Sequence, residues 1–139
     1  MASTLVLTRR DVARLLSLDD CIVAVEDAFR LAGQGLAPRP GILALPVRDG
    51  GFHVKAARLE RPRPYVAVKA NANFPHNRAR HGLPTVQGVI VLCDADCGRP
   101  LALLDSIEIT ALRTGAATAV AAKYLARPDA GTATICGCG

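Results

Sequence analysis

The chain has few aromatic residues and no long apolar run. Its 139 residues include three Phe, two Tyr and no Trp. No segment approaches the roughly 20 consecutive apolar residues that a membrane-spanning helix requires. The first ten residues also lack the charged start and apolar core of a secretory signal. These absences predict a cytoplasmic protein with no membrane partner.

The cysteines form no pattern that is typical of a metal site. There are five of them, an odd number, and a reducing compartment would keep them as free thiols. The pairs Cys93/Cys97 and Cys136/Cys138 lack the C-x2-C spacing of common structural zinc sites, and no H-x3–5-H segment accompanies them. We therefore expect no metal, and zinc binding by these two pairs is the alternative.

Lys and Arg outnumber Asp and Glu in this chain, which gives a net charge of +5 and a pI near 9.3. Such an excess raises the hypothesis of nucleic-acid binding, because clustered cations attract phosphates. The arginines cluster at residues 58–63 and 78–80, in segments next to Pro and Asn, with too few aromatic side chains to stack bases. We expect solvated loop charge and no nucleic-acid partner, although an anionic small-molecule substrate would use part of this excess.

The first third of the chain carries two helix-start signals. These capping boxes pair Thr8 with Asp11 and Ser17 with Asp20. The first is followed by apolar residues at helical spacing and predicts a short helix over residues 9–16. The second opens an amphipathic pattern that predicts a longer helix ending at Gly33.

From Pro38 onward the pattern changes to short strands separated by Pro, Gly and Asn. The expected strands cover residues 41–45, 51–57, 65–71, 85–93 and 99–104. Residues 94–98 have the composition of a hairpin turn, which pairs the last two strands. The prediction is an α+β fold in which the N-terminal helices pack on a mostly antiparallel sheet.

A third helix and a glycine turn follow the strands. Asp105 and Glu108 resemble another capping box, and the helix is expected to end before Pro128. Its many Ala and Gly residues make it thin, which suits either a closely approaching ligand or tight helix packing. After it, residues 132–136 read as an apolar strand. Residues 137–139 read as the first two glycines of a G-x-G-x-x-G turn or as a tail of no functional consequence.

Two cations stand out as candidate ligands for an anion. Strand alternation places Lys69 on a polar face with Tyr65, Asn71 and Asn73, which predicts either a cleft floor or a solvent-exposed face. Arg113 lies among small residues, and its planar fork suits a carboxylate or phosphate unless Glu108 or Glu26 pairs with it. Arg39 lies in a stiff Pro-flanked loop and is a weaker third candidate.

Five segments together resemble the ornithine cyclodeaminase/μ-crystallin family in order and spacing. They are residues 69–77, 82–88, 98–105, 109–118, and the predicted strand that leads into 137–139. The resemblance implies an NAD(P)-dependent enzyme that acts on amino acids or cyclic imines and forms a homodimer. Its domains would be a substrate-binding and dimerisation domain over 1–104, a linker helix over 105–129, and the start of a truncated Rossmann domain over 130–139.

The resemblance also implies roles for particular residues. Lys69 and Arg113 match the basic residues at the substrate carboxylate, with Arg39 as a third. Thr85 matches a position near the cofactor, and the resemblance brings Arg113 close to the cofactor as well. Gly137 and Gly139 match the opening of the pyrophosphate loop. The cofactor is expected to be NAD, with NADP as the alternative.

The activity that the resemblance implies is conversion of L-ornithine to L-proline and ammonia. The alternatives are an alanine dehydrogenase, a ketimine or pyrroline-carboxylate reductase, and a non-catalytic crystallin-like binding protein. The family's acidic catalytic residue is expected beyond Gly139, so the catalytic residue is not identified. Residues 1–139 alone are expected to be inactive.

Overall fold

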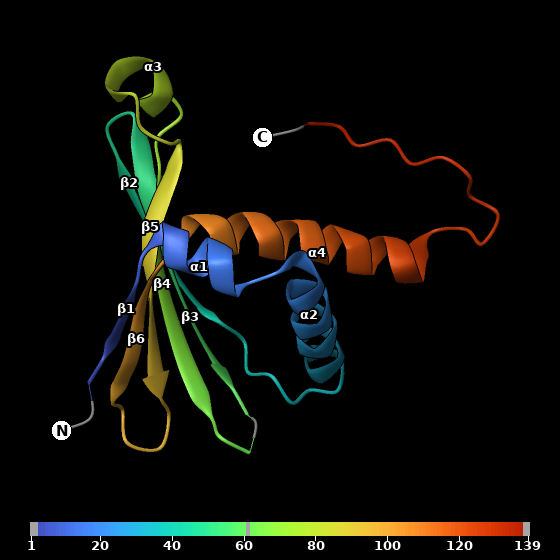
Figure 1. The fold of residues 1–139 in the computed structure, drawn as a ribbon, viewed down its shortest axis with the longest axis horizontal. Coiled ribbons are helices and arrows are strands. Elements are labelled where there is room, and N and C mark those ends of the chain that lie inside the picture. The colour runs from blue at the N-terminus through green and yellow to red at the C-terminus, as the bar shows by residue number, and fades with distance from the viewer. Residues whose placement is uncertain (1–2, 61, 138–139) are drawn as a thin grey trace.

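A six-stranded sheet organises the structure, a computed structural model that describes residues 3–60 and 62–137 (Figure 1). The elements are β1 (Leu5–Leu7), α1 (Arg9–Leu15), α2 (Leu18–Gly33), β2 (Gly41–Val47), β3 (Gly50–Leu59), β4 (Tyr65–Asn73), α3 (Asn77–His81), β5 (Val86–Asp94), β6 (Pro100–Asp105) and α4 (Ile107–Leu125). The strand order is β1-β6-β5-β4-β3-β2, and every neighbouring pair except β1–β6 is antiparallel. The predicted α+β class and mostly antiparallel sheet are confirmed.

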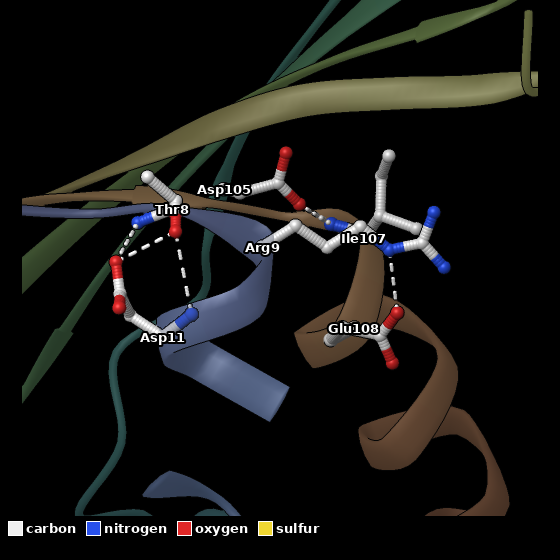
Figure 2. Close-up of polar contacts among 6 residues, drawn as sticks. All are labelled: Thr8, Arg9, Asp11, Asp105, Ile107 and Glu108. Atoms are coloured by element: carbon white, nitrogen blue, oxygen red, sulfur yellow. Dashed lines mark hydrogen bonds and ion pairs between the residues drawn. The ribbon is translucent and has the colours of Figure 1, made fainter. Parts of the chain in front are cut away.

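The two predicted capping boxes form and start α1 and α2. The Thr8 amide donates to the Asp11 carboxylate at 3.0 Å, and the Asp11 amide donates to the Thr8 hydroxyl at 3.3 Å (Figure 2). Ser17 and Asp20 exchange the same pair of hydrogen bonds. These bonds favour the charged carboxylates and hold the pKa of Asp11 and of Asp20 below the ordinary value.

The third predicted capping box, between Asp105 and Glu108, is wrong. α4 begins one residue later than expected, after Ser106, and the Asp105 carboxylate accepts a hydrogen bond from the Ile107 amide at 2.8 Å. Glu108 instead accepts from the Arg9 guanidinium at 2.6 Å, an ion pair that joins α1 to the first turn of α4 (Figure 2). The fold brings Arg9 close to Glu108, and its guanidinium binds the Glu108 carboxylate in place of the Asp105 backbone amide that a capping box would supply.

Two elements were not expected, and one expected strand is absent. β1 is only three residues long and pairs with β6 nearly a hundred residues later in sequence, so local alternation could not reveal it. α3 is a single short turn of helix. The strand predicted over 132–136 is not formed, and residues 130–137 carry no helix or strand. A strand needs a neighbour for its backbone groups, and no described strand pairs with this segment.

Helices α1, α2 and α4 lie on one side of the sheet, and α2 packs beside α4 (Figure 1). Ala116 of α4 is completely buried, so the thin helix provides tight packing. Lys123 of α4 donates to Glu26 of α2 at 2.8 Å, and the Tyr124 hydroxyl donates to the same carboxylate. None of the described helices is both long and apolar enough to cross a bilayer.

Gly88 of β5 lies where the sheet backbone approaches a side chain too closely for a Cβ atom. It is the register partner of Asn71 on β4. A Cβ on Gly88 would overlap the Ala70 carbonyl oxygen and the Asn71 side-chain oxygen. The Gly88 carbonyl also accepts from the Ser106 amide at 3.0 Å, where the chain enters α4. Glycine is therefore required at this crossing of β4, β5 and the start of α4.

We expect Gly88→Ala to lower the free energy of unfolding by about 1–3 kcal/mol, the typical cost of overpacking. Urea unfolding followed by circular dichroism measures the change. Gly33→Ala is the matched control, because a Cβ there meets nothing within 4 Å and α2 gains the better helix former. Equal stability of the two variants would contradict the close approach at Gly88.

Candidate functional site

A small pocket of about 160 Å³ lies between the sheet and the first turns of α4. We call it the cation pocket. Its polar lining consists mainly of His53 and Lys55 from β3, Lys69 and Asn71 from β4, and Thr110 and Arg113 from α4. The structure therefore brings together the two cations that the sequence singled out, one from the sheet and one from the helix.

The cation pocket has no acidic side chain in its lining. Lys55 and Lys69 are direct register partners on β3 and β4, so their Cβ atoms are about 4.5–5.5 Å apart. Burial, followed by the charges of Arg113 and Lys55, lowers the pKa of Lys69 below its ordinary value. Three cations without a carboxylate make this pocket suitable for an anion.

Asn71 fixes the position of α4 relative to the floor of the pocket. Asn71 is only 9% exposed, and its side-chain oxygen accepts from the hydroxyl of the completely buried Ser106 at 2.8 Å. Its amide nitrogen donates to the Thr110 hydroxyl at 3.5 Å. Thr110 lies almost one helical turn before Arg113, so these bonds hold the first turns of α4, and with them Arg113, above β4.

The carboxylates that the sequence offered as partners of Arg113 are bound elsewhere. Glu108 pairs with Arg9, and Glu26 pairs with Lys123 and Tyr124. Within residues 3–60 and 62–137, Arg113 forms no ion pair. The polar face of β4 is partly covered by α2 and α4, so Lys69 lies on the floor of the cation pocket and is half-buried.

The other predicted site residues do not line the cation pocket. Arg39 is exposed and lines a separate pocket of about 640 Å³ farther along the same sheet face, with Tyr65 and Ala67. Thr85 is exposed and directly precedes Val86, which lines the cation pocket. Gly137 has a positive φ of 99°, and Gly139 lies outside the described residues.

Lys55 and His53 were not predicted as site residues. Each lies on β3, and each is the register partner of a β4 residue in the pocket: Lys55 of Lys69, and His53 of Asn71. Alternation alone shows that they share a face of β3. Only the register of the β3–β4 pair shows that they meet the pocket residues.

Another hollow of the described surface is larger than the cation pocket but is less suited to a polar substrate. It is a groove of about 720 Å³ between α2 and α4. Its lining is largely apolar, and its two carboxylates are already paired, Glu26 with Lys123 and Asp27 with Arg30. Among the described residues, no group of three or more His, Cys, Asp or Glu side chains is placed to hold a metal ion.

Comparison with known proteins identifies the family. The model of the ornithine cyclodeaminase/mu-crystallin family matches residues 2–139. The chain belongs to this family. It is 40% identical over 136 residues to an alanine dehydrogenase of Archaeoglobus fulgidus, covering 98% of this chain and 41% of that protein. It is 35% identical over 150 residues to an L-lysine cyclodeaminase of Streptomyces rapamycinicus, covering 98% and 42%.

Solved structures share the fold and contain the predicted cofactor. An archaeal alanine dehydrogenase dimer with bound NAD superimposes with a TM-score of 0.85 at 40% identity, covering 91% of this chain and 38% of that chain. The Thermococcus litoralis Δ1-pyrroline-2-carboxylate reductase, in complex with NADH and L-proline, gives 0.80 at 39% identity, covering 91% and 39%. The chain thus spans about two-fifths of the length of these relatives, which are NAD(H)-binding enzymes.

We expect the cation pocket to lower the stability of the folded state. A lowered pKa means that the folded state disfavours the protonated Lys69 amine, so this penalty is present at neutral pH and disappears above the ordinary pKa of 10.5. We expect Lys69→Met to raise the free energy of unfolding at pH 7 by up to about 1 kcal/mol.

Urea unfolding at pH 7 measures this change. Lys123→Met is the matched control and should lower stability slightly, because Lys123 is bound to Glu26. A loss of stability in Lys69→Met would show that the surroundings of Lys69 favour its charge.

Proposed function

We propose that this chain is the substrate-binding part of an NAD-dependent enzyme that interconverts an amino acid and its imine. The observation that carries the proposal is that Lys69 and Arg113 line one pocket that contains no acidic side chain. An Arg fork can bind both oxygens of a carboxylate, and a Lys ammonium adds a point charge beside it. Two fixed cations would orient a substrate before reaction.

In the proposed reaction, these residues bind and orient while the cofactor carries the redox step. When bound, NAD⁺ would supply the acceptor for a hydride from the substrate's α-carbon, and loss of a proton from the amine would then give the imine. Lys69 and Arg113 hold the carboxylate so that the α-carbon keeps one orientation. Asn71, through Ser106 and Thr110, keeps α4 and therefore Arg113 in place. Arg39 lines a neighbouring pocket, so we leave it outside this carboxylate site.

We also propose the division into a substrate domain over 1–104, a linker helix over 105–129, and the start of the cofactor domain over 130–139. The positive φ of Gly137, with open space around its Cβ position, fits a glycine turn that approaches a pyrophosphate. Thr85, beside the pocket, is proposed to lie near the cofactor.

We also propose a cytoplasmic location. The four described cysteines are free, which supports a reducing cytoplasmic setting.

Cyclodeamination of ornithine is a second candidate activity. The family match and the 35% identity to an L-lysine cyclodeaminase support it. In that case the imine formed from the α-amine would be attacked by the distal amine, with loss of ammonia and return of the hydride. Product analysis with ornithine distinguishes the two candidates, because cyclodeamination yields proline without net formation of NADH.

Arg113→Ala in the full-length protein should reduce kcat/KM for the amino-acid substrate. Loss of one charged contact of about 1.5–3 kcal/mol corresponds to roughly 10- to 150-fold. Formation of NADH at 340 nm gives the rate. Arg99→Ala is the control, because Arg99 is exposed in the β5–β6 turn and does not line the pocket. Unchanged kcat/KM in Arg113→Ala would remove Arg113 from the proposed site.

We further propose that a second copy of the chain covers the sheet face opposite the helices. Large apolar side chains of β2, β3 and β5 are exposed there, at positions that alternate with residues on the helix-covered face. They are Leu43 (54% exposed), Leu45 (46%), Phe52 (41%) and Val89 (43%). An apolar patch spread over several strands is typical of a protein–protein interface.

Leu45→Glu should convert the dimer to monomer, because it places a charge on this apolar face next to Phe52, its register partner on β3. Light scattering coupled to size exclusion measures the mass. Leu125→Glu is the control: Leu125 is 82% exposed at the end of α4, away from the sheet, so the dimer should persist. A dimer that survives Leu45→Glu would contradict the proposed interface.

A further inference from the structure

We propose that the cation pocket takes a substrate with two anionic groups, an amino or imino dicarboxylate, and that Lys55 binds the second carboxylate. This inference rests on the proposed function, which assigns the first carboxylate to Lys69 and Arg113. It goes beyond that function by naming the substrate class and a further specificity-determining residue.

Lys55 and Lys69 lie directly opposite each other on adjacent strands. Lys55 is the direct register partner of Lys69, and both side chains line the pocket. Like charges at directly opposite positions of an antiparallel pair are destabilising. Lys55 forms no ion pair within the described parts of the chain. Two adjacent lysines therefore share a pocket in which none of the described residues supplies a carboxylate to offset either charge.

The pocket contains more positive charge than a single carboxylate can offset. Lys55, Lys69 and Arg113 together bring three positive charges, and His53 adds a further donor. A substrate with one carboxylate offsets only one of these charges. A diamino acid would add a distal ammonium beside Lys55, where like charges repel. A dicarboxylate offsets a second charge and gives Lys55 a partner.

The pocket has room for only a small ligand. Its volume of about 160 Å³ is below the range of pockets for drug-sized ligands. It suits a short dicarboxylate whose two groups reach cations on different elements: Arg113 on α4 and Lys55 on β3. A phosphate of the cofactor could bind the same cations, and measuring both NADH and succinate affinity in a Lys55 variant distinguishes this alternative from a dicarboxylate.

The test measures binding in the full-length protein by isothermal titration. Succinate and glutarate are the dianionic probes, and propionate and butyrate are the monoanionic probes of similar shape. One additional charge-assisted contact should make the dianions bind about 10- to 100-fold more tightly. Lys55→Gln should abolish this preference, and Lys55→Arg should retain it. Lys123→Gln, which removes a Lys charge bound to Glu26 outside the pocket, should leave it unchanged.

Steady-state rates with NAD⁺ provide the second readout. We expect kcat/KM for aspartate or glutamate to exceed that for alanine and ornithine by at least about tenfold. Equal affinity for succinate and propionate would overturn the inference. A Lys55→Gln variant that loses affinity for NADH but keeps its preference for succinate would also overturn it, since Lys55 would then belong to the cofactor site.

The two proposals can fail separately. NAD-linked turnover of alanine or ornithine without a preference for dicarboxylates would overturn the inference and leave the proposed function standing. Tight succinate binding that depends on Lys55, without NAD-linked turnover of any amino acid, would overturn the proposed function and support the assignment of Lys55.

Discussion

The buried hydrogen bond from Ser106 to Asn71 is the contact on which the site depends. It joins the C-terminal part of β4 to the residue that precedes α4, and both partners are shielded from water. A broken bond would leave a buried polar atom unsatisfied, which costs about 1–3 kcal/mol. Gly88 makes room for it by having no side chain. Because this junction is fixed, Arg113 of α4 lines the same pocket as Lys69 of β4.

The distribution of charge separates the pocket from the rest of the described surface. Elsewhere, several cations are paired with carboxylates, and two of these ion pairs connect elements that are distant in sequence: Arg9 with Glu108 and Lys123 with Glu26. In the pocket, cations from two strands and one helix converge without a carboxylate. Exposed ion pairs contribute little to stability. Converging cations reduce stability, and such an arrangement is typical of a site shaped for binding rather than for folding.

Local signals in the sequence predicted local structure well. Capping boxes start α1 and α2 as expected, because a cap depends only on residues three positions apart. The capping box expected at the start of α4 failed where tertiary structure brought Arg9 to Glu108. β1 was missed because its stability comes from β6, and the strand expected over 132–136 is not formed because no described strand pairs with it.

The sequence by itself determined the family, the fold class and the candidates Lys69 and Arg113, since motif order, alternation and capping are properties of the linear chain. The tertiary structure alone decided that these two cations share one pocket, that Arg39 lies in another, and that Lys55 joins them. The reason is register: a shift of one residue in the β3–β4 pair would turn Lys55 to the other face. That register is set by contacts between strands and helices, which no local pattern records.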